Sequence, residues 1–508
     1  MRRRSYLSLG LLLVAQLTGA VSQVLPAAEG TSPTEWATGL PEDVGLDSGV
    51  LAEMFDYARQ HEIPVHSVQI VRHGRLVLDS YFYPYRVEMR HDVASVTKSV
   101  TSTLIGLAIQ KGYLHDVHQS IVDLFPDRSF VHRDERKSRV TLEHLLMMEV
   151  GWDCGFEPKE ARLYEMRRTS DWLQFMLDLP MVAEPGTRFA YCSGNPHVLS
   201  IILGKTTGTN ALAFARSELL GPLGISDVAW PADPSGNNYG WGDLQLRPRD
   251  MAKLGQLFLQ RGRWGERQIL SESWVHTATD NHVERTVNKD HYGYAWWVKG
   301  EDRPGMFEAV GRGGQRINVW PLKDVVTVFT GGGFEPGDLG QFIVRSLRSD
   351  DPLPANPEAA SRLRDRIMAA AKPPPPQPIK QAPATAERIS AKPIKMSANG
   401  LGVQELTLTF DGKAEAKADL RFDGHIEHLL VGLDGVERSS TNAQAGLPIA
   451  CKGEWVAADA FLLQVDLVGR INFYKIKLTF SAHSSKVDVT LNERTGLNDE
   501  EFSGVLAE

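Results

Sequence analysis

Hydrophobic and polar residues follow two different patterns along this chain, and a proline-rich stretch separates them. Between residues 33 and 350, short strand-like apolar runs are mixed with longer runs that have helical spacing. Between residues 396 and 508, runs such as QELTLTF, FYKIKLTF and KVDVTL alternate apolar and polar residues and are separated by turn residues. The patterns predict an α/β domain at 33–350 and an all-β domain at 396–508, a sandwich or barrel of roughly five to eight strands.

The first domain is expected to join early and late strands in one antiparallel sheet, with a helical region inserted between them. Residues 67–82 hold two strand-like runs around the turn RHGR, which is typical of a hairpin. Late strands are predicted at 292–298, 316–322 and 325–330, and helices at 96–112, 141–148 and 249–262. The fold class that follows is α/β (α+β), with helices flanking the sheet.

Two segments lie outside these domains. Residues 351–395 contain the helix-like run EAASRLRDRIMAAA followed by KPPPPQPIKQAP, which is typical of a semi-rigid linker. Residues 1–28 begin with three arginines, continue with an apolar run from Leu7 to about Ala15 and then have small residues. This is the layout of a signal peptide and predicts export to the periplasm or medium, and RRSYL resembles a twin-arginine signal. The alternative is an N-terminal anchor that stays attached.

The composition and net charge of the chain argue against some classes of binding partner. Of 508 residues, 42% are hydrophobic and 23% are charged, as in a globular protein with a large core. The net charge of −8 argues against a nucleic acid or an anionic membrane as partner, and no membrane contact is expected after signal removal. There are three cysteines, and spacing alone leaves open whether Cys154 and Cys192 pair. None of them has metal-site spacing, and Cys451 reads as a small buried apolar residue.

The stretch DVASVTKSV places Ser95 and Lys98 three residues apart at the start of a predicted helix. This spacing puts both side chains on one helix face, where a lysine can act as base for a serine nucleophile. The helix N-terminus also favours developing negative charge. The simpler interpretation is that Ser95 caps the helix and Lys98 lies in solvent.

Two later segments favour the catalytic interpretation. In PGTRFAYCSGN, Tyr191 stands between a turn and an apolar run, where a phenol can relay protons. In AVGRGGQRINVW, glycines precede a strand, so the backbone can approach a substrate and an amide there can complete an oxyanion hole. A core tyrosine and a tight turn are the alternatives for the two segments taken singly.

With these segments the sequence resembles the serine hydrolases of the class C β-lactamase and penicillin-binding-protein type over about residues 45–345. The resemblance rests on SVTKS, PGTRFAYCSGN, LRPRDMAKLGQLFLQRGRW, YGYAWW and GRGGQ. The last three are most similar to the branch of 6-aminohexanoate-dimer hydrolases and β-lactamase-like esterases. The resemblance implies Ser95 as nucleophile, Lys98 and Tyr191 as general acid and base, and the backbone amides of Ser95 and Gln315 as oxyanion hole. It implies no metal and no organic cofactor.

The sequence departs from the family pattern at two positions that concern substrate recognition. Many members read Tyr-x-Asn where this chain has Tyr191-Cys192-Ser193, and β-lactamases usually read Lys-Thr-Gly where it has Arg312-Gly313-Gly314. Ser193 lacks the amide of an asparagine, and Arg312 offers a planar cation suited to a carboxylate. Core packing and pocket lining are equally open interpretations of the aromatic candidates Trp152, Trp241 and Tyr294.

The sequence therefore predicts an exported serine hydrolase that cleaves an ester or amide bond in a small molecule, short peptide or oligoamide. β-Lactam hydrolysis and D-amino-acid peptide cleavage remain alternative reactions. A further alternative is a penicillin-binding-protein-like binding module with little or no turnover. The histidine pairs of HDVH (115–118) and HIEH (425–428) lack a third ligand. The all-β domain is expected to contact the catalytic domain or a polymer.

Overall fold

The computed structural model describes residues 36–131, 134–155, 160–284, 290–441 and 447–507. The predicted signal peptide lies outside the described residues, so export stays a prediction. Residues Trp36–Glu508 form one compact unit. In the described part of the chain, no single helix has the length and hydropathy of a membrane span, and the bent pair Gly194–Thr207 and Ala211–Leu220 meets those criteria only jointly.

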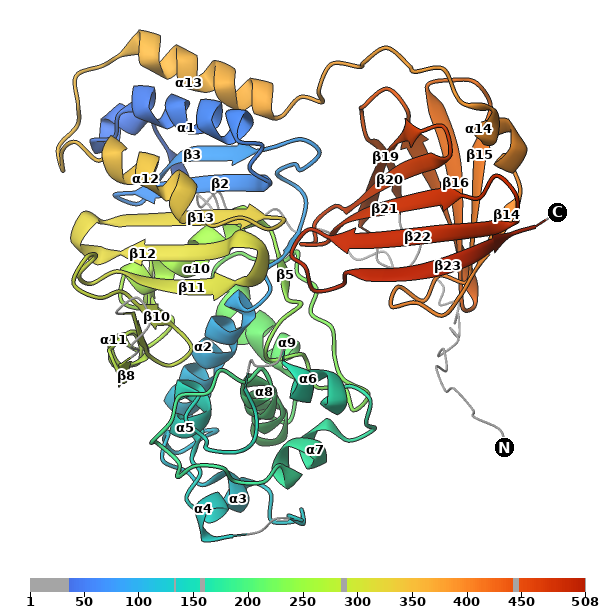
Figure 1. Cartoon of the computed structure of the whole chain (residues 1–508). Helices are drawn as coiled ribbons and strands as arrows, with labels where there is room; N and C mark the ends of the chain where they lie inside the picture. Colours follow the sequence, from blue (N-terminus) through green and yellow to red (C-terminus); the bar gives the residue numbers. More distant parts are fainter. Residues whose placement is uncertain (1–35, 132–133, 156–159, 285–289, 442–446, 508) are drawn as a thin grey trace, which may run out of the picture. The chain divides into compact units, whose positions relative to one another are not determined.

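A nine-stranded sheet in the described part of the chain organises the first domain (Figure 1). Its order is β1-β3-β2-β13-β12-β11-β10-β9-β8. The strands are β1 (Ala37–Thr38), β2 (Val65–Arg72), β3 (Arg75–Tyr81), β8 (Val283–Glu284), β9 (His291–Tyr292), β10 (Trp297–Val298), β11 (Phe307–Gly311), β12 (Gln315–Trp320) and β13 (Val325–Gly331). β2 pairs antiparallel with β13, with Val68 opposite Phe329, which confirms that early and late strands share one sheet. β1 runs parallel to β3, so the sheet is mixed.

Helices cover both faces of this sheet (Figure 1). α1 (Ser48–Gln60), α12 (Gly337–Ser346) and α13 (Pro357–Ala370) lie on one face, where they enclose a core that includes Val68 and Phe329. α10 (Pro248–Leu259) packs on the other face. A Cβ on Gly255 of α10 would come 2.5 Å from Val326 Cγ1, so glycine is needed for this close helix–sheet contact.

α2 (Val96–Gln110) is the helix that carries the Ser–Lys pair. Thirteen of its fifteen residues are buried, because it lies between the sheet and the inserted helical region. That region contains α3 (Ile121–Leu124), α4 (Glu135–Ser138), α5 (Leu142–Met147), α6 (Ala161–Met166), α7 (Trp172–Asp178), α8 (Gly194–Thr207) and α9 (Ala211–Ala215). Because α2 is packed on all sides, its N-terminal end is held in place. Ser95 is the N-cap residue at that end.

The strand predicted at 292–298 is wrong in one respect, because the chain reverses inside it. β9 ends at Tyr292 and β10 begins at Trp297, and the two pair antiparallel with each other. Between them Gly293 N donates to Trp296 O at 2.8 Å, and Ala295 has a φ of +60°. A run of apolar residues does not reveal such a turn, because a two-residue strand is too short to show alternation.

The C-terminal residues form a closed β-barrel of ten strands among the described residues. They are β14 (Pro393–Met396), β15 (Glu405–Phe410), β16 (Glu415–Phe422), β17 (His425–Gly432), β18 (Arg438–Thr441), β19 (Pro448–Ala457), β20 (Ala460–Leu467), β21 (Phe473–Phe480), β22 (Lys486–Glu493) and β23 (Glu500–Leu506). Pairing of β17 with β19, at Gly432 and Lys452, closes the barrel. The expected five to eight strands are an undercount, because short polar strands such as β18 (RSST) carry no apolar alternation.

The predicted linker is partly folded. The helix expected in EAASRLRDRIMAAA is α13, which packs on α1 through Leu363 and through an ion pair of Arg366 with Asp56 at 2.7 Å. Residues 373–383 have neither helix nor strand, and α14 (Ala384–Ile389) then precedes the barrel. The extended connection is therefore confined to the proline-rich residues.

A buried carboxyl group, Asp466, lies at the end of the barrel that meets the first domain. Tyr85 OH donates to both of its oxygens, at 3.1 and 3.2 Å. Burial, and secondarily the Glu437 carboxylate, raises the pKa of Asp466 to about 7. In an unfolded chain the pKa of an aspartate is near 4. Between about pH 4 and pH 7, Asp466 is therefore protonated in the folded protein and ionised in the unfolded chain.

Stability is expected to depend on pH through Asp466. Between pH 4 and pH 7 the folded state binds the extra proton, so the free energy of unfolding falls as pH rises and this contribution levels off above about pH 7. Asp466→Asn keeps an acceptor for Tyr85 and removes this titration. We expect the thermal midpoint of the variant, relative to wild type, to be higher at pH 8 than at pH 5. Equal differences at the two pH values in thermal unfolding scans would contradict the assignment.

Candidate active site

Ser95 and Lys98 lie in direct contact at the beginning of α2. Lys98 Nζ is 2.8 Å from Ser95 Oγ and also donates to the carbonyl of Trp241 at 3.0 Å. Ser95 occupies the N-cap position, yet its hydroxyl makes no capping hydrogen bond. Lys98 is only 2% exposed, and no ion pair joins it to a carboxylate within the described ranges. Neither part of the simpler interpretation, a capping serine and a solvated lysine, fits this geometry.

Tyr191 joins this pair from the loop before α8. Lys98 Nζ lies 4.9 Å from the centre of its ring, and the ring stacks on Trp297 at 6.1 Å between centroids. Ser95, Lys98 and Tyr191, far apart in sequence, therefore surround one point in space. The Tyr191 ring therefore lies directly beside the Lys98 side chain.

A disulfide between Cys154 and Cys192 settles the pairing that the sequence left open. Their Cα atoms are 5.6 Å apart. Cys192 follows Tyr191 directly, so the bond ties the tyrosine loop to the loop that carries Trp152. Cys451 is a free, buried cysteine, and burial raises the pKa of its thiol.

Removing the disulfide is expected to affect stability and activity together. The bond closes a loop across 38 residues, for which chain entropy gives a stabilisation of about 4 kcal/mol. We expect Cys154→Ser/Cys192→Ser to lower the free energy of unfolding by about 2–4 kcal/mol and to lower kcat, because Tyr191 loses its anchor. Urea unfolding and ester hydrolysis measure the two effects. Cys451→Ser, which changes a cysteine outside the site, is the control for activity and should leave kcat within about two-fold.

The glycine-rich segment GRGGQ, which the sequence places before a strand, forms a tight turn before β12. Arg312–Gly314 form one 3₁₀ turn, in which Gly313 and Gly314 have φ values of +84° and +97°. Gln315, which is fully buried, uses its side chain to hold this turn: Nε2 donates to Gly331 O at 2.6 Å and to Arg312 O at 3.2 Å. The Gln315 side chain therefore fixes the turn and is not available to contact a substrate.

These segments border a cavity of about 1280 Å³. Among the residues predicted from the sequence, its lining includes Ser95, Tyr191, Ser193, Trp152, Trp241, Arg312, Gly313 and Gly314. Lys98 and Gln315 are buried directly behind that lining. Tyr294 is not part of it, because its hydroxyl donates to Glu143 at 2.5 Å in the core. The cavity is larger than most small-molecule sites and accommodates an extended substrate.

Sequence reasoning missed two carboxyl groups beside the nucleophile, Asp92 and Asp243, which also line the cavity. Asp92 is 5% exposed and accepts a hydrogen bond from Ala94 N at 2.8 Å. Burial, and secondarily the Asp243 carboxylate, raises the pKa of Asp92 to about 7. No motif marks either residue, because their proximity depends on the pairing of β4 (His91–Asp92) with β5 (Gln245–Leu246).

The lining also includes four residues of the barrel that the sequence did not indicate, namely Ile471, Arg494, Thr495 and Leu497. They come from the loops after β20 and β22. Arg312 Nη1 donates to Thr495 Oγ1 at 2.5 Å, so the arginine proposed for substrate recognition is engaged by the barrel. Nothing in the spacing of these residues links them to the Ser–Lys pair.

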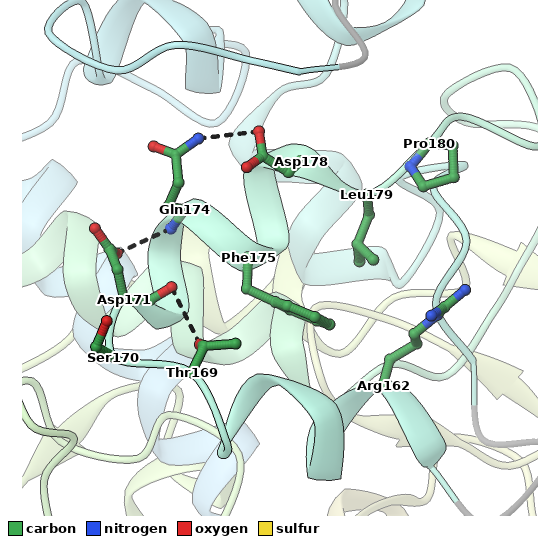
Figure 2. A pocket seen from close by; sticks show the side chains of 9 residues that line it. All are labelled: Arg162, Thr169, Ser170, Asp171, Gln174, Phe175, Asp178, Leu179 and Pro180. Carbon is green, nitrogen blue, oxygen red and sulfur yellow. Dashed lines mark hydrogen bonds between the residues drawn. The ribbon is translucent and has the colours of Figure 1, made fainter. Parts of the chain in front are cut away.

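Two other features fall outside this site. A smaller hollow of about 380 Å³ lies along α7, where Gln174 Nε2 donates to Asp178 Oδ1 at 3.0 Å (Figure 2). It contains none of the predicted catalytic residues.

Within the described ranges no group of three or more histidine, cysteine, aspartate or glutamate side chains is arranged to hold a metal. His118 of the HDVH run is exposed and lies 3.4 Å from Glu143, which is partly buried.

Comparison with known proteins agrees with the fold of the first domain. A family model described as Beta-lactamase matches residues 50–340. The 6-aminohexanoate-dimer hydrolase of Paenarthrobacter ureafaciens is 24% identical over 331 residues, which cover 61% of this chain and 82% of that protein. Among solved structures, EstCE1, a hydrolase with promiscuous acyltransferase activity, matches with a TM-score of 0.50 and 16% identity over 59% of this chain and 99% of its own. The octameric penicillin-binding protein homologue from Pyrococcus abyssi covers 90% of this chain and 99% of its own at 17% identity, with a TM-score of 0.48.

Proposed function

This chain belongs to the beta-lactamase family, and on that premise we propose that it is a serine hydrolase that cleaves an ester or amide bond through an acyl-enzyme on Ser95. The observation that carries the proposal is the 2.8 Å contact between Lys98 Nζ and Ser95 Oγ at the border of a large cavity. Burying a lysine amine without a paired carboxylate costs free energy, and at Lys98 this amine is held against a serine hydroxyl that lines the cavity.

In the first half of the proposed reaction, Ser95 Oγ attacks the substrate carbonyl while Lys98 Nζ takes the hydroxyl proton. The carbonyl oxygen becomes an oxyanion that the backbone amides of Ser95 and Gln315 stabilise. Ser95 lies at the first turn of α2, where the helix N-terminus favours that negative charge.

In the second half, the tetrahedral intermediate collapses and the bond to the leaving group breaks. Tyr191, coupled to Lys98, supplies the proton that the leaving alcohol or amine needs. A water molecule then attacks the acyl-enzyme, gives up a proton to the same pair and releases the carboxylic acid and free Ser95. The reaction needs no redox partner and no further co-reactant.

We propose a linear ester or amide as substrate, such as a small ester, a short peptide or an oligoamide. Ser193 and Arg312 replace the family residues that contact a β-lactam, which lowers the expectation for that substrate class. The cavity volume of about 1280 Å³ accommodates a chain of several residues. The similarity to a 6-aminohexanoate-dimer hydrolase makes short 6-aminohexanoate oligomers the first amides to test.

Covalent labelling tests the proposal directly. Treated with a fluorophosphonate, the full-length protein should gain the mass of one phosphonyl group, and peptide mapping should locate it on the peptide that contains Ser95. A hydrolysis screen with short esters, 6-aminohexanoate oligomers, a D-amino-acid peptide and a β-lactam then defines the substrate. Binding of these compounds without labelling or turnover would instead favour a non-catalytic binding module.

We also propose export, which rests on the N-terminal sequence and is supported by the Cys154–Cys192 disulfide. Structural disulfides are typical of oxidising compartments outside the cytosol. Intact mass of the protein recovered from a bacterial periplasm should show loss of about the first 28 residues. An unprocessed N-terminus in that fraction would contradict cleavage.

A further inference from the structure

The barrel contacts both segments that carry the proposed oxyanion-hole amides. On the first side, Asp92 N, three residues before Ser95, donates to Gly469 O of the β20–β21 loop at 2.7 Å. Gly469 has a φ of +84°, and a Cβ there would come 2.6 Å from Arg90 O. Only glycine allows the barrel to come this close to the nucleophile segment.

On the second side, the barrel holds the turn before Gln315. Arg312 Nη1 donates to Thr495 Oγ1 at 2.5 Å and lies 3.8 Å from Glu493 Oε1. The Glu493 side chain is fully buried, and its Oε1 makes no hydrogen bond within the described residues. The guanidinium is thus one of two neighbouring charges, with Arg494, that compensate this buried carboxylate, which gives the contact an energetic consequence.

Glu493 also orders the loop that carries Thr495. Its Oε2 accepts hydrogen bonds from Thr495 N at 3.1 Å and from Leu497 N at 3.3 Å, and the Thr495 hydroxyl contacts it as well. Next to this contact, Ile471 packs on Gly313, where an added Cβ would meet Ile471 Cγ2 at 2.3 Å. Arg312 and Gly313 are therefore fixed from the barrel side, while Gln315 fixes the turn from the sheet side.

We propose that the barrel is a working part of the active site, in which Thr495 and Glu493 are positioning residues that hold the 312–315 turn in its oxyanion-binding geometry. This inference rests on the proposed function of that turn. An oxyanion hole requires two amides at a fixed separation, and the barrel braces the segments of both. It also gives the C-terminal domain a role in catalysis, in place of retention on a polymer.

The test uses the full-length protein with Thr495→Val, which keeps the side-chain shape and removes the hydroxyl. We expect kcat for a small ester to fall about ten-fold with KM within about two-fold, because the turn loses its brace while the pocket keeps its shape. Arg312→Met should have a similar effect, and the double variant should be no worse than Arg312→Met alone, since both act through one contact. Ile471→Ala, which removes packing instead of a hydrogen bond, should also lower kcat.

Thr490→Val is the matched control, because Thr490 lies on the same strand, β22, outside the cavity lining. It should leave kcat and KM unchanged. Hydrogen exchange measured by mass spectrometry gives a readout independent of turnover: Thr495→Val should speed exchange in the peptide covering 311–316, and Thr490→Val should not.

The outcomes separate the two proposals. Unchanged exchange at 311–316 and unchanged kcat in Thr495→Val would overturn the positioning role. If wild type neither labels with a fluorophosphonate nor hydrolyses any ester while exchange still rises in Thr495→Val, the contact stands and the proposed hydrolase function fails. If the losses of kcat add up in the Arg312→Met/Thr495→Val double variant, Thr495 acts by a route other than its contact with Arg312. That result would overturn this contact as the cause.

Discussion

The Ser95→Ala variant is expected to lose covalent labelling completely and to lose about 10⁵- to 10⁶-fold in kcat/KM towards any substrate that wild type hydrolyses. The reason is that Ser95 combines a hydroxyl, a buried lysine amine at 2.8 Å and a place on the cavity lining. The backbone amides and the pocket remain in the variant, so it should still bind substrate and keep a small residual rate.

Ser102→Ala is the matched control for this experiment. Ser102 lies about two turns further along α2, and its buried hydroxyl has no hydrogen-bond partner in the described part of the chain. Removing an unsatisfied buried hydroxyl should leave stability equal or slightly higher and activity within about two-fold. Steady-state kinetics and thermal unfolding, measured on both variants, test these expected changes in activity and stability. A Ser95→Ala protein that retains more than about a tenth of wild-type kcat/KM would exclude Ser95 as nucleophile.

The contact between Ser95 and Lys98 could be predicted from the sequence because it depends on local spacing. Ser95 and Lys98 are one helical turn apart, so a single helix determines that the two side chains meet. The turn before β12 was foreseen from its glycines, since two successive residues with φ above +80° require that residue type. Tyr191 is different, because its position relative to Lys98 depends on packing of α8 against α2. Its own segment shows only a phenol between a turn and an apolar run, and the resemblance to known hydrolases gave it a role beside Lys98.

The parts that the sequence did not predict depend on contacts between distant residues. Alternating apolar residues are the same in a sandwich and in a barrel, and the closing pair of Gly432 with Lys452 carries no sequence signal. The contact of Thr495 with Arg312 joins loops 183 residues apart. Loop residues reach an active site through the docking of two domains, and the composition of either loop alone does not show it.

Lys98→Met is the second decisive variant, and it should lower kcat/KM about 10³- to 10⁴-fold while the fold is kept. Methionine has nearly the length and volume of the lysine stem, so the buried space stays filled. Ser95 keeps its hydroxyl but loses the acceptor for its proton, and the Trp241 carbonyl loses a donor. In the variant, kcat/KM should therefore rise with hydroxide concentration. In wild type, kcat/KM should depend much less on hydroxide concentration over the same pH range.

Lys137→Met provides a control of the same kind at another place. Lys137 is also a buried lysine, 3% exposed, and donates to a backbone carbonyl, that of Leu177, at 2.6 Å. Both substitutions remove one buried amine and leave one carbonyl without its donor, so any general effect on stability should be similar. Only Lys98→Met should lose catalysis. Equal losses of kcat/KM in the two variants would mean that the Lys98 effect is structural, and a loss below about ten-fold in Lys98→Met would assign the base to another group.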